Sequence, residues 1–373
     1  MGNDSTMRRV VARFYDRYVT PADRALLNAV FAAAPAQETL DACLRVCDIE
    51  VMGAHKALML SYLMHERPEL RFPEYAAPRL RGLIRFFRFA NLKTLAHFSK
   101  TGKAFNEAGI PVLLFKGAAM KVLRPELSRP MGDVDVLVPR ERLGEAVRIC
   151  EGLGYLRCRE ESRHGVDFHT ETESAVDVHH SIFDPPGDAR KLHGGLFARS
   201  APRRAFGVDF LLPRHEDLCF LVMTNFTKNL REHTTLGGLY YALCDCRFLQ
   251  RDKKDFDWSL VRKNAADSGR ELEVRFAAEF MNAIVPGAVP DADRRLPAGR
   301  DMEAFCNQII FDEEYYLKRQ RECQAIRVVE LKNRPWHFGK RIGKFLLMKR
   351  LRRVPAFVRW YLATRCGKAC DAH

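Results

Sequence analysis

Long apolar runs are missing from this sequence, since no window approaches the eighteen or so uncharged apolar residues that a membrane-spanning helix requires. The N-terminus also lacks the apolar core and small-residue cleavage site of a secretory leader. The eleven cysteines do not have zinc-finger or zinc-ribbon spacing, because their closest pairs are Cys43/Cys47, Cys244/Cys246 and Cys366/Cys370. We therefore expect a cytoplasmic protein with reduced thiols.

Acidic residues are absent between Glu330 and Asp371, where twelve lysines and arginines occur. These twelve charges account for most of the formal net charge of +14 and leave about +2 for the remainder. Aromatic and aliphatic residues alternate with the cations. This basic amphipathic tail, residues 331–373, has three open interpretations: peripheral binding to an anionic membrane surface, binding to RNA or another polyanion, or simple coverage of the core by its apolar face.

The remaining sequence predicts an α+β fold with a small mixed sheet between helical flanks. Apolar residues at helical spacing, over roughly 38–64 and 78–108, indicate a helical N-terminal region, residues 1–108. Thr20, Pro21 and Asp23 form a helix-start signal within it. Short apolar or alternating segments predict strands in a core of residues 109–213. Helical patterns return over residues 214–330.

Two aspartates lie inside the β-branched stretch "RPMGDVDVLVP", at Asp133 and Asp135. Side chains alternate along a strand, so both carboxylates point to the face opposite the valines. Like charges at this spacing repel, unless a multiply charged cation lies between them. Asp177, in "VDVH", repeats the pattern on a second predicted strand. Three carboxylates from two strands would suit Mg²⁺ bound to substrate phosphates. The pair Asp133 and Asp135 alone is more often a solvated strand face than a metal site.

The stretch "FKGAA" predicts a strand that turns at Lys116 and Gly117 into a short helix. The first turn of such a helix directs backbone N–H groups, here together with a lysine, at an anion. A lysine at a strand end is also common on any soluble surface. His179 and His180 fit either ligands or ordinary packed and surface side chains.

Five motifs follow one another along the chain: "GIPVLLFKGAAM", "RPMGDVDVLVP", "GLGY", "VDVHH" and "PRHEDLCFLV". In this order they resemble the uncharacterised nucleotidyltransferase family, a branch of the DNA polymerase β-like superfamily. The resemblance extends over roughly residues 25–270. The lysine-glycine turn combined with the spaced aspartates is fairly specific, whereas each motif alone is weak. The resemblance implies a nucleotidyltransferase-type sheet and the transfer of a nucleoside monophosphate.

The resemblance also implies roles for the acidic residues. Asp133 and Asp135 would bind two metal ions, and Asp177 would complete the catalytic metal site and help deprotonate the acceptor hydroxyl. His179 matches the histidine of the family, which has no settled role. Mg²⁺ is the expected ion, with Mn²⁺ as an alternative.

The matched phosphate-binding positions are Lys116, Gly117 and Arg129. Gly117 would let the backbone approach the triphosphate, with Lys116 as a counter-charge. A guanidinium at Arg129 could stabilise charge on the transferred or leaving phosphate. The wider superfamily usually has serine after the glycine, where this chain has Ala118, and we interpret this difference as a changed grip on phosphate.

These observations lead to one principal hypothesis, a magnesium-dependent enzyme that transfers a nucleoside monophosphate from an NTP such as ATP and releases pyrophosphate. Its acceptor, a small molecule, sugar, protein or RNA, is open. The alternative is a catalytically inactive nucleotide-binding or scaffold protein whose basic tail docks on a membrane or RNA.

Overall fold

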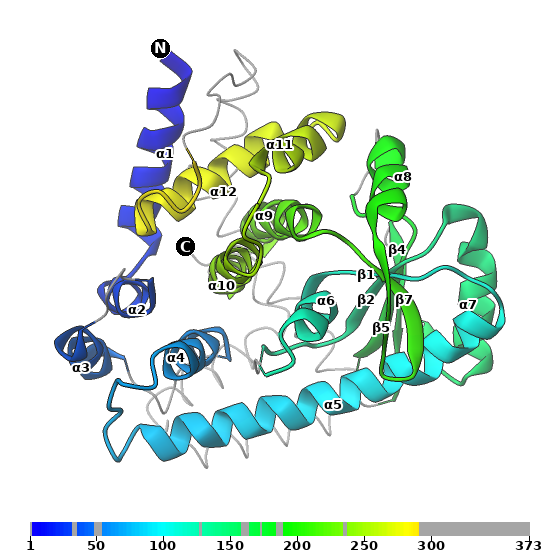
Figure 1. The fold of residues 1–373 in the computed structure, drawn as a ribbon, viewed down its shortest axis with the longest axis horizontal. Coiled ribbons are helices and arrows are strands. Elements are labelled where there is room, and N and C mark those ends of the chain that lie inside the picture. The colour runs from blue at the N-terminus through cyan, green and yellow to red at the C-terminus, as the bar shows by residue number, and fades with distance from the viewer. Residues whose placement is uncertain are drawn as a thin grey trace, which may run out of the picture. The chain divides into compact units, whose positions relative to one another are not determined.

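The computed structural model describes residues 2–31, 36–47, 54–126, 129–157, 164–171, 174–183, 189–233 and 237–290 (Figure 1). Apart from residues 231–233, these belong to one compact unit that spans residues 1–230 and 235–307. The predicted basic tail, residues 331–373, lies outside the described residues. None of the described helices combines the length and the apolar character needed to cross a bilayer.

Five helices make up the N-terminal region: α1 (Gly2–Tyr18), α2 (Pro21–Phe31), α3 (Gln37–Val46), α4 (Ala54–Glu66) and α5 (Ala77–Glu107). The prediction of a single helix over 38–64 is wrong, because α3 ends at Val46 and α4 begins at Ala54. The backbone becomes extended at Cys47, with φ −98° and ψ 108°, which ends α3. The predicted helix over 78–108 is confirmed as α5.

The predicted helix-start signal is a reciprocal cap at the beginning of α2. Thr20 Oγ1 accepts a hydrogen bond from the backbone N–H of Asp23 at 3.1 Å, and the Asp23 carboxylate accepts one from the Thr20 N–H at 3.3 Å. Asp23 is also buried, and its Oδ1 forms an ion pair with Lys56 Nζ at 2.8 Å. A short-range sequence signal therefore also contributes to packing between α2 and α4.

The strands form one mixed sheet in the order β3-β4-β5-β2-β1-β7-β6. The neighbours β2 and β5 are parallel, as are β1 and β7, while the other pairs are antiparallel. The strands are β1 (Leu113–Leu114), β2 (Val134–Leu137), β3 (Leu156–Arg157), β4 (Gly165–His169), β5 (Ser174–His179), β6 (Ala201–Ala205) and β7 (Val208–Leu212). This mixed sheet confirms the predicted α+β class.

The sequence patterns do not indicate β3 or β6. Each lies at an edge of the sheet, and neither has the buried alternate residues that mark a half-buried strand. The strand β6 pairs with β7 through a two-residue turn at Phe206 and Gly207. Both turn residues have positive φ, 56° and 74°, as a type I′ hairpin turn requires. Local turn geometry therefore accounts for β6.

Helices connect the strands and continue after them. The connecting helices are α6 (Lys116–Leu123), the 3₁₀ turn η1 (Arg140–Arg142), α7 (Leu143–Gly152) and α8 (Ala189–Arg199). The C-terminal helices are α9 (His215–His233), α10 (Gly237–Arg251), α11 (Trp258–Asp267) and α12 (Glu271–Ile284). The long helix α5 packs against β5 and β7, so the N-terminal region contacts the sheet directly.

The N-terminal and C-terminal helices pack against each other beside the sheet, α1 on α12 and α4 on α10 (Figure 1). The ring of Phe14 lies edge-on to the rings of Phe276 and Phe280, with centroids 5.8 and 5.5 Å away. Helices α1 and α12, which are far apart in the sequence, therefore share one apolar core. The four-region division of the chain stays a prediction.

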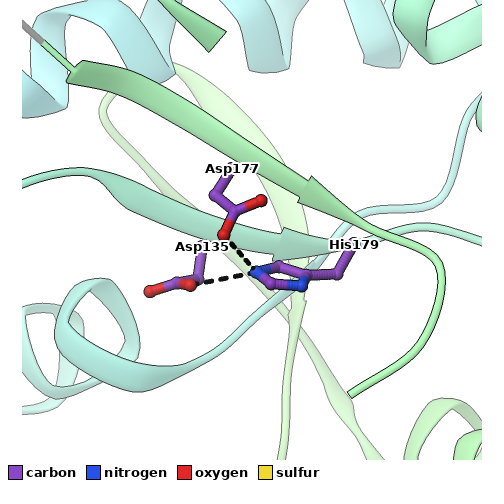
Figure 2. Close-up of side chains that lie close together, drawn as sticks. All are labelled: Asp135, Asp177 and His179. Atoms are coloured by element: carbon purple, nitrogen blue, oxygen red, sulfur yellow. Dashed lines mark hydrogen bonds and ion pairs between the residues drawn. The ribbon is translucent and has the colours of Figure 1, made fainter. Parts of the chain in front are cut away.

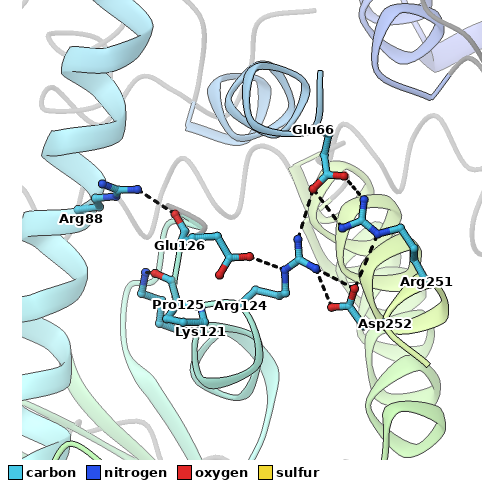
Figure 3. A network of polar contacts seen from close by, with 8 residues as sticks. All are labelled: Glu66, Arg88, Lys121, Arg124, Pro125, Glu126, Arg251 and Asp252. Atoms are coloured by element: carbon cyan, nitrogen blue, oxygen red, sulfur yellow. Dashed lines mark hydrogen bonds and ion pairs between the residues drawn. The ribbon is translucent and has the colours of Figure 1, made fainter. Parts of the chain in front are cut away.

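An arginine cluster joins the end of α6 to this helical layer (Figure 3). Arg124 follows α6 and donates to Asp252 Oδ1 at 2.7 Å and to Glu66 Oε1 at 3.3 Å. Arg251, at the end of α10, also pairs with Glu66, the last residue of α4. The orientation of α6 relative to α4 and α10 is therefore fixed by charge-assisted hydrogen bonds.

Alanine substitutions at two glycines of α5 test the packing of this helix against the sheet. Gly82 is exposed, and an added Cβ would meet no atom within 4 Å, so Gly82→Ala should raise the free energy of unfolding by about 0.5–1 kcal/mol through helix propensity. At Gly102 a Cβ would lie 2.6 Å from Val208 Cγ1. Gly102→Ala should therefore lower the free energy of unfolding by about 1–2 kcal/mol. Urea unfolding of both variants checks this, and equal stabilisation would contradict the described packing of α5.

Candidate active site

The site begins with two carboxylates on neighbouring parallel strands. Asp135 of β2 and Asp177 of β5 are register partners, so their side chains project from the same face of the sheet (Figure 2). The flanking residues Val134, Val136, Val176 and Val178 are buried, each at most 1% exposed. The predicted alternation is confirmed, since valine burial fixes both strands with the carboxylates on the opposite face.

His179 lies between these carboxylates (Figure 2). Its Nε2 is 2.7 Å from Asp177 Oδ2 and 3.1 Å from Asp135 Oδ1. The imidazole is buried, stacked on His164 and edge-on to Phe115, with ring centroids 5.3 and 5.2 Å away. His179 is therefore fixed at the centre of the carboxylate pair rather than on the surface.

Lys116 approaches the same pair from the first residue of α6. Its Nζ is 2.5 Å from Asp135 Oδ1, and its backbone has a φ of 50°, which is uncommon for a residue with a side chain. The short strand β1 leads directly into this bend and into α6, which confirms the predicted strand, turn and helix. The bend directs the lysine towards β2.

Gly117 and Arg129 meet at the first turn of α6. An added Cβ at Gly117 would lie 2.5 Å from Arg129 Nη1 and 3.0 Å from Met131 Cγ. A side chain at this position would displace the guanidinium, so the close approach favours glycine. Among the predicted phosphate-binding residues, the structure therefore brings Lys116, Gly117 and Arg129 to the start of α6.

Lys116 and His179 compensate the carboxylate pair, in which Asp135 is buried and Asp177 is half-buried. Burial opposes ionisation of Asp135, but the Lys116 ammonium and the hydrogen bond from His179 outweigh it and lower the pKa of Asp135. Burial likewise opposes the charges of Lys116 and His179, while the neighbouring carboxylates outweigh it and raise both pKa values. The pair is therefore stabilised in its ionised form.

Asp133 lies at the edge of this group. It precedes β2, is half-buried, and stands outside the set of ligand atoms formed by Asp135, Asp177 and His179. Burial, and then repulsion by Asp135, raise its pKa to about 6. Asp133 is thus electrostatically coupled to the pair, and its role as a metal ligand stays a prediction.

A fourth carboxylate, Asp167, was missed by the sequence reasoning. It is exposed on β4 as the register partner of Asp177. Partial desolvation beside the sheet, and then the interaction with the neighbouring Asp177 carboxylate, raise the pKa of Asp167 to about 7. The signal was available in the sequence, since "GVDFH" repeats the valine-aspartate alternation of "AVDVH".

The described residues fit a divalent cation. Ligand atoms of Asp135, Asp177 and His179 lie within 4.8 Å of one another. Asp177 Oδ1 is buried, and among the described residues no N–H or O–H group donates to it. Carboxylate oxygens prefer hard cations such as Mg²⁺ and Mn²⁺, while an imidazole ligand also suits softer ions. His179 could act as a ligand only after it loses the proton that it shares with the carboxylates. A metal could therefore bind at this group, with one carboxylate oxygen available to it.

Comparison with known proteins identifies the family. The model of the uncharacterised nucleotidyltransferase family matches residues 52–286, from just before α4 to just after α12. The chain belongs to this family. It is therefore a nucleotidyltransferase, an enzyme that transfers a nucleoside monophosphate group, as the resemblance implied. The match includes the whole sheet and the helices α4 to α12.

Two solved structures of the antibiotic-resistance factor ANT(2″)-Ia are similar to this nucleotidyltransferase. Its solution structure is 18% identical, over 47% of this chain and 90% of the other, with a TM-score of 0.35. Its crystal structure in complex with adenylyl-2″-tobramycin is 19% identical, over 48% of this chain and 98% of the other, also with a TM-score of 0.35. None of the curated proteins matches the chain.

The carboxylate pair leads to a prediction for metal binding. Asp135→Asn combined with Asp177→Asn should weaken the affinity for Mn²⁺ at least about tenfold, because both charged oxygen ligands are replaced by neutral amides. Calorimetric titration of the full chain measures this affinity, with Mg²⁺ as competitor. Asp209→Asn is the matched control, since Asp209 is an exposed carboxylate on β7 paired with Arg204. Unchanged affinity in the double variant would contradict a metal site at this pair.

Proposed function

We propose that this nucleotidyltransferase is magnesium-dependent, transfers the nucleoside monophosphate of an NTP to an acceptor hydroxyl and releases pyrophosphate. The observation that carries the proposal is the placement of Asp135 and Asp177 side by side, directly in front of the first turn of α6. A carboxylate pair and an anion-binding helix start together suit a metal-bound triphosphate.

The triphosphate binds at the start of α6. Backbone N–H groups of the first turn point out of the helix, and Gly117 lets an anion approach them closely. Lys116 and Arg129 supply positive charge on the two sides of this turn. Electrostatic stabilisation by such fixed groups is usually the largest contribution to phosphoryl transfer.

Asp133, Asp135 and Asp177 would hold the metal. Bound Mg²⁺ would neutralise phosphate charge and polarise the α-phosphate. The acceptor oxygen forms a bond to the α-phosphorus, while the bond from that phosphorus to the bridging oxygen breaks. The bridging oxygen takes the electron pair and leaves with pyrophosphate. The hydroxyl proton passes to the carboxylate of Asp177, so atoms and charge balance.

The test combines Asp133→Ala with Asp135→Ala in the full chain. Each radiolabelled NTP is incubated with Mg²⁺, the protein and fractions of a cell extract that supply acceptors. We expect wild type to release pyrophosphate and label one fraction, and the double variant to lose at least about 100-fold in rate, because the phosphates lose their charge partner.

The control is Asp209→Ala, which removes an exposed carboxylate of the same sheet and should leave the rate unchanged. Equal rates for wild type and the double variant would rule out this site. Binding of NTP by wild type without pyrophosphate in every acceptor fraction would argue against the proposed transfer and favour nucleotide binding alone.

A further inference from the structure

We infer that Asp245 and Asn91, from the helical regions, are positioning residues that hold Arg129 against the triphosphate at the start of α6. The inference rests on the proposed function and extends it, because neither residue belongs to the carboxylate site. Both lie in helices, Asn91 in α5 and Asp245 in α10. Three contacts fix Arg129 and leave other atoms of its guanidinium available.

The first contact fixes the guanidinium from α10. Arg129 Nε lies 3.1 Å from Asp245 Oδ1 and 3.0 Å from Oδ2. The Asp245 side chain is 3% exposed and that of Arg129 15%, so the pair is largely shielded from water. A buried carboxylate needs its charged partner, and removing either one leaves an unpaired buried charge. The pair therefore has one strongly preferred geometry.

The second contact fixes the plane of the guanidinium. Its Cζ lies 4.8 Å from the centroid of the Tyr241 ring, within the range of a cation–π interaction. Tyr241 and Asp245 are four residues apart on α10, so they share one face of that helix. One face of α10 thus contacts the Arg129 guanidinium twice: Asp245 binds its edge and Tyr241 packs against its plane.

The third contact fixes the backbone of Arg129 from α5. Asn91 donates through Nδ2 to the carbonyl oxygen of Arg129 at 2.6 Å, and its Oδ1 accepts from the N–H of Met131 at 3.2 Å. Asn91 is 1% exposed, and its amide bridges the residues on either side of Pro130. Helix α5 therefore holds the loop, while α10 holds the side chain.

These contacts leave the terminal nitrogens of Arg129 facing α6. A guanidinium has five N–H donors, and the described hydrogen bonds of this one involve Nε alone. Its Nη1 lies 2.5 Å from the position that a Cβ of residue 117 would take. An anion on the first turn of α6 would therefore meet an arginine that is already oriented, which avoids the entropy loss of ordering it.

The experiment measures binding, so it needs no acceptor. Titration calorimetry with Mg²⁺ gives the affinities for inorganic pyrophosphate, for AMP and for a nonhydrolysable analogue of the NTP that wild type binds best. Asp245→Asn and Asn91→Ala should each weaken binding of pyrophosphate and of the analogue by about tenfold or more. The affinity for AMP, which lacks the β- and γ-phosphates, should change less than about twofold.

A double-mutant cycle separates positioning from a merely structural role. In an Arg129→Met background, Asp245→Asn should cause no further loss of pyrophosphate affinity, because the group it positions is gone. The matched control is Asp217→Asn, a fully buried carboxylate of α9 paired with Arg199 at 2.7 Å, which should leave pyrophosphate affinity unchanged. Circular dichroism verifies that each variant is folded.

Three outcomes overturn the inference: unchanged pyrophosphate affinity in folded Asp245→Asn, equal losses for AMP and the analogue, or additive losses in the cycle. Failure of the proposed function is distinct, because wild type would then bind neither the analogue nor pyrophosphate with Mg²⁺. If Asp245→Asn does not fold, Asn91→Ala and its own cycle with Arg129→Met decide the inference.

Discussion

The placement of two like charges in register on adjacent parallel strands, with Asp135 buried and Asp177 half-buried, is the constraint on which the rest of this structure depends. Asp135 and Asp177 repel each other, and burial removes the water that would otherwise screen them. Their ionised forms persist because His179 and Lys116 each contact the pair. The positive φ of Lys116 and the buried position of His179 bring cationic groups into contact with the carboxylates.

The helices around the sheet also serve the site. Arg124 ties the end of α6 to α4 and α10, and Arg129 is held from α10 through Asp245 and from α5 through Asn91. The end of α6 and the loop that carries Arg129 are therefore fixed from both flanking regions. A short helix positioned in this way presents its N–H groups without much loss of conformational freedom on binding.

Much of the sheet and its chemistry could be predicted because the signals are local. Valine-aspartate alternation identified β2 and β5, and the lysine-glycine turn identified the start of α6. The same valine-aspartate alternation occurs around Asp167 in β4, although the sequence analysis did not single out this residue. The edge strands β3 and β6 were not predictable in the same way, because β6 depends on a hairpin turn and β3 on pairing with β4, rather than on a buried apolar face.

The sequence by itself determined that this chain has an α+β fold, a pair of strands that carry carboxylates, a lysine-glycine turn before a helix, and the motifs of its nucleotidyltransferase family. Each of these features depends on residue identity and short spacing. Tertiary structure alone decided which carboxylates meet, that His179 lies between them, and that Asn91 and Asp245 contact Arg129. Asp245 lies 116 positions from Arg129 and Asn91 lies 38 positions from it. Contacts across such separations depend on how helices and strands pack, which local periodicity does not specify.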